Sequence, residues 1–299
     1  MKKAFFGILI LIIILALPLI FKSREYKHLE GPQLSDLNYT EVFYENEKEG
    51  IKLGGMLFVP ENGNEIPVVS IIHGSGTSRR NSVWYLSVTK HLLDNGIAVL
   101  LPDKRGCEKS EGNWKGVKLE DLGNDVLASV EFIKHQNVFE ISEIGILGMS
   151  QGGWIAPVAA SKSDDISFVI NMSGAMVSPT EQLLHEEINN ISPYTYRFLA
   201  RMIAPISVKS IKRSQLFSPF VSFNPVSYWQ KVQVPVFIAY GENDKNVPID
   251  NCLEILKQPD FNHYKTKVYP TGGHGIINPE TQKLNEKYLE DLVNFIKQH

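Results

Sequence analysis

A serine lies at the centre of the stretch around which this sequence is organised. Residues 148–153 read GMSQGG, which places Ser150 in a G-x-S-x-G pattern. An apolar run at 144–147 precedes it, and residues with helical propensity follow at 154–160. A strand, a tight glycine turn and a helix would expose the Ser150 hydroxyl at the edge of a sheet. The pattern therefore indicates a serine nucleophile beside a helix start, where free backbone N–H groups favour an oxyanion.

A base and an acid that could activate this serine follow it in the chain. Asp244 closes a Gly-Glu-Asn-Asp loop after the apolar run 234–240, and His274 lies in GGHG after the run 264–269. A serine hydroxyl is a weak nucleophile until a base removes its proton. Neutral histidine suits that task, and a carboxylate can hold its tautomer. Glu242 is the nearest rival for the acid.

The elements that must position these residues alternate along the chain. We expect a hairpin at 41–45 and 51–59 with Glu49-Gly50 in its turn, and further strands at 68–72, 97–101, 144–147, 168–172, 234–240 and 264–269. Helices are expected at 82–94, from 119 to about 133, at 154–160 and at 280–297. This alternation predicts an α/β fold with a doubly wound, mostly parallel sheet buried on both faces. Ligands bind beyond the carboxyl ends of such strands, where Ser150, Asp244 and His274 would meet.

Five motifs in order give the sequence a resemblance from about residue 40 to its end. They are HGSG at 73–76, PDKRG at 102–106, GMSQGG, YGENDKNVP at 240–248 and GGHG. Together they resemble the α/β-hydrolase superfamily, in its esterase and serine-aminopeptidase-like branches. The resemblance implies a catalytic triad in the chain order Ser150, Asp244, His274, with no cofactor and no metal. It also implies an oxyanion hole formed by the backbone N–H of Gln151 and one from the Gly74-Ser75 segment, assigned to Ser75.

Other polar residues have simpler interpretations. His73 is expected to support its loop, and Asp103 and Arg105 to act as a structural ion pair or loop anchor. The acidic group Glu181, Glu186 and Glu187 is expected to form a solvated helix face, although a carboxylate there could hold a substrate amine. The remaining histidines have no metal-ligand spacing with cysteine or carboxylate; they are His28, His91, His135, His185, His263 and His299.

The sheet pattern pauses from about 175 to 230, which is too long for a plain connection. We interpret this insert as a small, mostly helical cap on a hydrolase domain that spans 39–299. Its aromatic and apolar residues, such as Tyr194, Phe198 and Met202, suit the covering of an apolar acyl chain.

The first residues predict a membrane tether. Lys2 and Lys3 precede eighteen uncharged residues, 4–21, enough for a helix of about 27 Å, just able to cross a bilayer. No small-residue cleavage site follows, so residues 1–21 are predicted to be an uncleaved signal anchor and 22–38 a linker. The catalytic domain would then lie outside the cytoplasm. The alternative is secretion after signal-peptide cleavage.

Composition limits the partners. A net charge of -3 over 299 residues gives no electrostatic case for nucleic acid. The two cysteines, Cys107 and Cys252, are expected to be free buried thiols, although one bridge stays possible on sequence grounds. The oligomeric state is left open.

These observations favour a serine hydrolase that cleaves small-molecule carboxylic esters through an acyl-enzyme. A peptidase or amidase on the same triad is the rival within enzymes. A catalytically silent hydrolase-fold binding protein is the alternative outside them. The natural acyl and alcohol groups are set by the shape of the pocket and the cap, which the sequence alone does not give.

Overall fold

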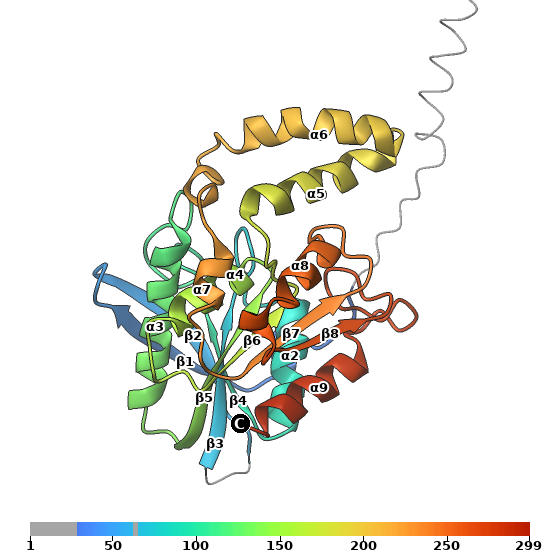
Figure 1. Cartoon of the computed structure of the whole chain (residues 1–299). Helices are drawn as coiled ribbons and strands as arrows, with labels where there is room; N and C mark the ends of the chain where they lie inside the picture. Colours follow the sequence, from blue (N-terminus) through green and yellow to red (C-terminus); the bar gives the residue numbers. More distant parts are fainter. Residues whose placement is uncertain (1–28, 62–64) are drawn as a thin grey trace, which may run out of the picture.

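Eight strands form one sheet in the order β1-β2-β4-β3-β5-β6-β7-β8 in the computed structural model, which describes residues 29–61 and 65–299 (Figure 1). Strands β1 and β2 pair antiparallel, as do β2 and β4, and the other neighbours are parallel. This confirms the predicted mostly parallel α/β sheet. The strands are β1 Thr40–Asn46, β2 Ile51–Phe58, β3 Glu65–Ile72, β4 Ala98–Pro102, β5 Glu140–Met149, β6 Phe168–Met172, β7 Val236–Gly241 and β8 Lys265–Tyr269.

Helices cover both faces of this sheet. Helices α2 (Val83–Asp94) and α9 (Glu286–Ile296) pack on one face, and α3 (Leu119–His135), α4 (Gly152–Ala160) and α8 (Ile249–Leu256) on the other. A hydrophobic core lies on each face of the sheet, and successive strand residues point to opposite faces. In β5, Ile146 faces α3, α4 and α8, whereas Leu147 faces α2 and α9. Both side chains are fully buried. Central strands covered on both sides need such continuous apolar runs, which is why β5 lacks a polar face over this part.

The chain leaves the sheet between β6 and β7 and forms helices above the carboxyl ends of the strands (Figure 1). We call α5 (Pro179–Ile191), the short 3-10 turn Ser192–Tyr194 and α6 (Arg197–Ile211) the cap. Ser178 begins α5 by accepting a hydrogen bond from the N–H of Glu181 at 3.3 Å, and Pro179 occupies the first turn. The chain returns through the 3-10 turn Ser218–Phe220 and α7 (Pro225–Trp229), which anchors on the fully buried Trp229.

The last helix begins later than the sequence predicts. It was expected from about residue 280, but α9 begins at Glu286, because the Asn285 side chain caps it and accepts from the N–H of Tyr288 at 3.1 Å. The residues before it form a turn closed by a bridge between Ile277 and Leu284. Two short 3-10 turns complete the described elements, Leu34–Asp36 and Pro259–Phe261.

The predicted signal anchor at 1–21 and the first part of the predicted linker, 22–28, lie outside the described residues. Within the ranges 29–61 and 65–299, the helices are too short or too polar to cross a bilayer.

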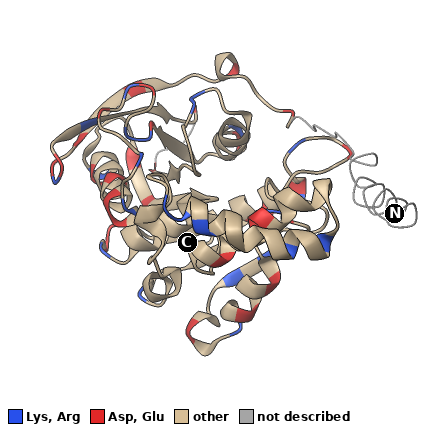
Figure 2. Ribbon diagram, turned by 90° about the horizontal axis from the view of Figure 1, so that it is seen from above, with Lys and Arg blue, Asp and Glu red and all other residues tan. Residues whose placement is uncertain are grey.

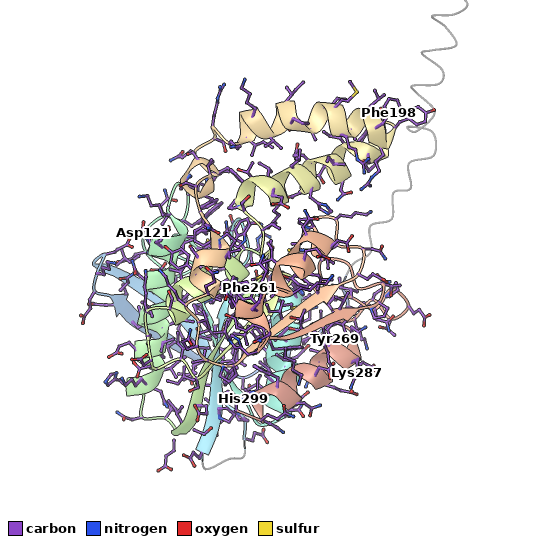
Figure 3. All side chains as sticks on the ribbon, viewed as in Figure 1. Asp121, Phe198, Phe261, Tyr269, Lys287 and His299 are labelled. Atoms are coloured by element: carbon purple, nitrogen blue, oxygen red, sulfur yellow. The ribbon has the colours of Figure 1, made fainter. Side chains whose placement is uncertain are left out.

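Helix α9 is tied to the last strand by a carboxylate. Asp291 is 5% exposed and accepts hydrogen bonds from Lys267 Nζ at 2.7 Å and Tyr269 Oη at 2.9 Å. Lys287 Nζ also lies near, 3.5 Å from Asp291 Oδ1; Figure 3 labels Tyr269 and Lys287. Burial alone would raise the pKa of Asp291, but the bonds from Lys267 and Tyr269 outweigh it and hold that pKa below its usual value.

We predict that Asp291→Asn lowers the free energy of unfolding at pH 7 by about 1–3 kcal/mol, because a charged acceptor is lost at a buried contact. A carboxyl whose pKa is lowered by folding stabilises the protein above its unfolded pKa and loses this contribution as pH falls. The difference from wild type, measured by urea denaturation, should therefore shrink below about pH 4. The exposed Glu290→Gln is the matched control. Equal effects of the two substitutions would contradict the prediction.

Candidate active site

Ser150 sits in a strained turn between β5 and α4. Its φ of 55° lies in the left-handed region, which is uncommon for any residue but glycine. Two backbone bonds hold it there: its N–H donates to the carbonyl of Met172 at 2.9 Å, and its carbonyl accepts from the N–H of Gly153 at 2.9 Å. Such strain persists only where the surrounding structure fixes it, and it lifts the hydroxyl above the sheet edge.

The glycines on either side of Ser150 are required by close backbone contacts. A Cβ at Gly148 would lie 2.3 Å from the carbonyl oxygen of Gly152, and a Cβ at Gly152 would lie 2.3 Å from that of Ile72. Any residue with a Cβ at either position would clash with the backbone. The G-x-S-x-G spacing is therefore a packing requirement of this turn as much as a conformational one.

The structure brings the three predicted triad residues together. His274 Nε2 lies 2.8 Å from Ser150 Oγ, and His274 Nδ1 lies 2.8 Å from Asp244 Oδ2. The Asp244 side chain is fully buried, whereas that of His274 is 22% exposed. The second carboxylate oxygen of Asp244 accepts from the backbone N–H groups of Asn246 at 2.7 Å and Val247 at 3.0 Å. These bonds fix the carboxylate with one oxygen directed at the imidazole.

Glu242, the rival acid, is placed elsewhere. Within the described part of the chain, its side chain makes one hydrogen bond, accepting from the N–H of Thr271 at 3.4 Å. It is exposed to solvent and not bonded to His274. The geometry thus pairs His274 with Asp244.

Two backbone N–H groups beside Ser150 remain free. The Gly74 N–H donates to Tyr85 Oη at 2.9 Å. In contrast, the N–H groups of Ser75 and Gln151 donate to no acceptor within residues 29–61 and 65–299. Both residues line the same cavity as Ser150. These are the two donors that the sequence predicts for an oxyanion hole, and Tyr85 removes the neighbouring Gly74 as an alternative.

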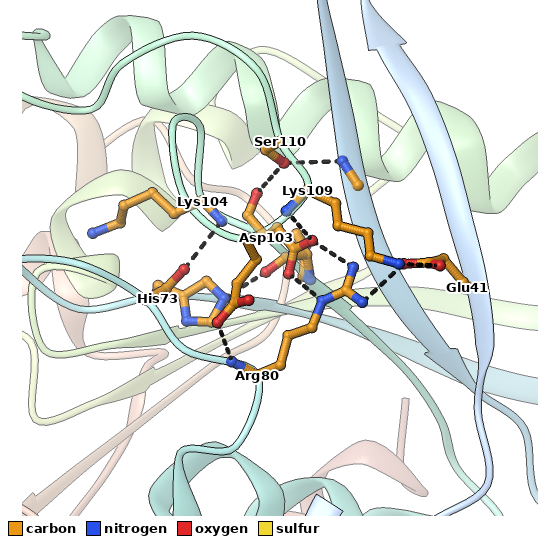
Figure 4. Close-up of polar contacts among 11 residues, drawn as sticks. Glu41, His73, Arg80, Asp103, Lys104, Lys109 and Ser110 are labelled. Atoms are coloured by element: carbon orange, nitrogen blue, oxygen red, sulfur yellow. Dashed lines mark hydrogen bonds and ion pairs between the residues drawn. The ribbon is translucent and has the colours of Figure 1, made fainter.

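The loop after β4 is held by ion pairs (Figure 4). Asp103 accepts from Arg80 Nε at 2.8 Å and Nη2 at 2.6 Å. Arg105 is 2.6 Å from Asp125 and from Glu49. Both predicted anchors are thus ion-paired, but Asp103 and Arg105 do not pair with each other. Each ties the loop to a different element.

Lys104, between these anchors, is a residue whose role the sequence analysis missed. It is 9% exposed, and its Nζ donates to the carbonyls of Gly74 and, at 2.9 Å, Gly76. Burial lowers the pKa of Lys104 to about 8. The amine therefore holds the segment that carries the Ser75 N–H. No periodicity or motif signals this contact, which depends on two loops meeting in space.

His73 supports the same loop, as predicted. Its Nε2 donates to the carbonyl of Pro102 at 2.5 Å, and its ring packs edge-on against Tyr85. Burial lowers the pKa of His73 to about 4, so the ring is neutral at physiological pH.

A cavity of about 290 Å³ lies between Ser150 and the cap. Its walls are largely apolar, with polar groups at the floor and on α5. They include Trp114, Trp154, Leu183, Ile211, Leu216, Phe217 and Phe220, together with Lys104, Gln182 and Glu186. Tyr194, Phe198 and Met202 are not among them, so the prediction that these cap residues cover the acyl chain is wrong.

Glu186 points into this cavity, so the prediction of a solvated helix face is wrong for it. Burial raises the pKa of the Glu186 carboxyl, partly against the influence of nearby His274. The other two acidic residues of α5 have partners: Glu181 accepts from Asn251 Nδ2 at 2.6 Å, and Glu187 accepts from Ser207 Oγ. Adjacent residues on an α-helix point about 100° apart, so Glu186 faces the cavity and Glu187 does not.

An open groove of about 460 Å³ lies on the other side of Ser150. His274 and Trp84 line it, together with Arg79 and Asn246. Trp84 Nε1 donates to the carbonyl of Gly275 at 3.2 Å, which braces the loop that carries His274. Ser150 therefore has a covered side under the cap and an open side beside His274.

Neither cysteine takes part in this site. Cys107 and Cys252 are both buried and free, as expected. Across the described residues, no group of three or more His, Cys, Asp or Glu side chains is arranged to hold a metal ion.

The nucleophile turn, the sheet topology and the Ser–His–Asp contacts define an α/β-hydrolase. The chain belongs to the prolyl oligopeptidase family, whose family model matches residues 84–299.

Relatives of this chain include both esterases and peptidases. Esterase EstD of Thermotoga maritima is 23% identical over 291 residues, which is 91% of this chain and 69% of EstD. Dipeptidyl peptidase family member 6 of Caenorhabditis elegans is 23% identical over 289 residues, but this chain spans only 37% of its length. It likewise spans 33% of the human acylamino-acid-releasing enzyme, at 21% identity over 253 residues.

A solved structure of an esterase from Pyrococcus furiosus superimposes with a TM-score of 0.68 at 21% identity. It covers 92% of this chain and 99% of the esterase. At this identity, the similarity demonstrates a common fold.

We predict that Lys104→Met weakens ester hydrolysis by about tenfold to a hundredfold in kcat, because a catalytic N–H displaced by a fraction of an ångström loses much of its effect. It should also lower the melting temperature, since two buried carbonyls lose their donor. Lys109→Met is the matched control: it lies in the same loop and pairs with Glu41 at the surface. If the two variants had equal kcat, Lys104 would not position the loop.

Proposed function

We propose that this protein is a serine hydrolase that cleaves carboxylic esters of small acyl groups, with Ser150 as nucleophile, His274 as base and Asp244 as its orienting acid. The observation that carries the proposal is the pair of 2.8 Å contacts that join Ser150 Oγ to His274 and His274 to Asp244. Such a constellation is recognised by geometry and roles.

In the proposed mechanism, Ser150 Oγ attacks the acyl carbonyl while His274 Nε2 takes the hydroxyl proton. The carbonyl oxygen becomes an oxyanion and accepts from the N–H groups of Ser75 and Gln151, each worth about 3 kcal/mol in the transition state. His274 then gives its proton to the departing alkoxide, which leaves an acyl-enzyme. A water molecule, deprotonated by the same nitrogen, attacks the acyl carbon, and His274 returns the proton to Ser150 Oγ as the acid leaves. Asp244 stabilises the imidazolium in both steps.

The two sides of Ser150 suit the two halves of an ester. His274 must reach the leaving oxygen and lines the open groove, so the alcohol half is assigned there. The acyl half then lies in the cavity under the cap, against Leu183 and Phe217. A 290 Å³ apolar cavity favours a short or medium acyl chain. Because burial raises the pKa of Glu186, its carboxyl is more easily kept neutral beside such a chain.

We predict that a fluorophosphonate probe labels the wild type at Ser150 and that Ser150→Ala removes labelling and lowers ester turnover by several orders of magnitude. His274→Ala should be nearly as damaging, because triad members act as a unit. Asp244→Asn should be severe and Glu242→Gln mild. Ser161→Ala, on the far end of α4, is the control for the loss of a serine.

Mass spectrometry of the labelled peptide decides between outcomes. Labelling at another serine would refute the nucleophile assignment. A folded wild type that neither labels nor turns over any ester would instead favour a catalytically silent binding protein.

A peptidase or amidase is the second candidate, and Glu186 is the observation that favours it. In a peptide substrate the acyl half carries the free amine, and that half is assigned to the cavity that Glu186 lines. A carboxylate there could pair with the amine. The family contains relatives whose names describe peptidases, in which this chain corresponds to about a third of the sequence.

We predict that kcat/KM for neutral short-chain esters exceeds that for aminoacyl anilides at least a hundredfold, or about 3 kcal/mol in barrier. An amide nitrogen is the poorer leaving group, and only one cap carboxylate faces the site. Comparable rates would reverse the choice. In that case Glu186→Gln should raise KM for the anilide and leave the ester unchanged, whereas Glu187→Gln should affect neither.

We also propose that residues 1–21 tether the protein to a membrane, with the catalytic domain outside the cytoplasm. The support is the uncharged run 4–21 after Lys2 and Lys3. The full chain should sediment with membranes and resist extraction by high salt, because apolar insertion is not screened as ionic adhesion is. Release by salt, or a mature N-terminus beyond residue 16, would refute the tether.

A further inference from the structure

Helix α6 carries its largest apolar side chains on its outer face. The residues that α6 buries are small: Ala200, Ala204 and Val208, spaced four apart. The side chains it exposes are large: Phe198 is 61% exposed, Met202 69% and Ile206 72%. These are again four residues apart, so they form one stripe along the helix. We call Phe198, Met202, Ile203 and Ile206 the outer stripe; Ile203 is 46% exposed beside the others.

The outer stripe lies at the extremity of the molecule. Helix α6 is the element farthest from the sheet in Figure 1, with α5 between it and the core. Phe198, labelled in Figure 3, sits at the far tip of the cap. The burial pattern of α6 turns its small residues inward, so packing on α5 leaves the outer stripe uncovered. A continuous apolar stripe on a soluble surface marks an interaction site.

The charges around the outer stripe are of one sign. Residues 188–230 contain five Lys or Arg and no Asp or Glu, in a chain whose net charge is -3. They are Arg197, Arg201, Lys209, Lys212 and Arg213. Figure 2 looks down on this part of the molecule, with basic residues in blue. Large apolar side chains among basic ones are the composition of helices that lie in the surface of an anionic bilayer.

The end of α6 adds a pocket suited to an anionic headgroup. An open pocket of about 370 Å³ is lined by Lys209, Lys212 and Arg213, with Pro205, Val208 and Val221 as its apolar part. Within the described residues, no hydrogen bond or ion pair engages the side chains of these three basic residues. Their ammonium and guanidinium groups are therefore available to phosphate oxygens.

We propose that the outer stripe and this basic pocket form a docking surface for an anionic lipid bilayer, with α6 lying in the plane of the headgroups. This goes beyond the proposed hydrolase activity and does not depend on it. A second copy of the chain fits the surface less well, because a symmetric contact would bring together the three basic residues of the pocket on each copy. Docking would place the cap against the lipid and leave the amino ends of the strands, on the side away from the cap, in water.

The experiment uses the full chain with an environment-sensitive nitrobenzoxadiazole probe on a single introduced surface cysteine. The natural cysteines are buried, so native labelling is selective for the new position. Met202→Cys carries the probe on the outer stripe. Val138→Cys is the matched control: it is 63% exposed, and it lies just before β5, at the amino end of that strand and thus away from the cap. Both proteins are mixed with phosphatidylcholine vesicles with or without about 30% phosphatidylglycerol.

We expect the emission of the probe at 202 to shift to the blue and rise severalfold with the anionic vesicles, less so with phosphatidylcholine alone, and to be quenched by doxyl-labelled lipid. The probe at 138 should not respond. Neutralising the basic pocket (Lys209→Gln, Lys212→Gln and Arg213→Gln together) should reduce the response and its dependence on salt, with ester turnover in solution unchanged.

An unchanged probe at 202, or equal responses at 202 and 138, would overturn the proposal. A response at 202 without vesicles that grows with protein concentration would assign the surface to a second copy. Because two positions on one full-length chain are compared, the result holds whether or not residues 1–21 insert. Loss of ester turnover in Ser150→Ala tests the hydrolase proposal separately.

Discussion

The site depends on one constraint, the left-handed backbone at Ser150. A non-glycine residue at a φ of 55° costs free energy, and the turn pays that cost through contacts on every side. Gly148 and Gly152 let the chain fold back on itself at distances that exclude a Cβ, and the carbonyl of Met172 accepts the Ser150 N–H. The outcome is a hydroxyl held above the sheet with the free N–H of Gln151 next to it. The other groups of the site must be positioned relative to this hydroxyl.

Three further loops meet it, and each is fixed by a different kind of interaction. Asp244 is oriented by backbone N–H groups, so its direction does not depend on flexible side chains. The loop of His274 is braced by Trp84 of α2, which donates to the carbonyl of Gly275, 191 residues later in the chain. The loop of Ser75 rests on Lys104, whose charge is buried and satisfied by carbonyls. Precision at the active site thus comes from rigid partners below it, while the cap above contributes cover and charge.

The sequence predicted those features that are local. Apolar runs ending in glycine-rich motifs give strand, turn and nucleophile together, so Ser150, Asp244 and His274 were found and their meeting point followed from the parallel sheet. Lys104 was missed because its partners are carbonyls of a loop about thirty residues away. The direction of Glu186 was misjudged because its solvent exposure depends on how the cap sits over the core. The start of α9 was placed too early because Asn285 redirects the chain within an otherwise helical pattern.

The uneven enclosure of Ser150 bears on the fate of the proposed acyl-enzyme. Once the alcohol has departed through the groove beside Trp84 and His274, that same passage is the route by which the next nucleophile arrives, while the acyl group stays beneath the cap. Nothing in such a passage selects water by shape. An abundant small alcohol or amine would compete with water for the same intermediate, and acyl transfer would then give a new ester or an amide in place of the free acid. The balance between hydrolysis and acyl transfer would be set by what the surroundings supply at that entrance.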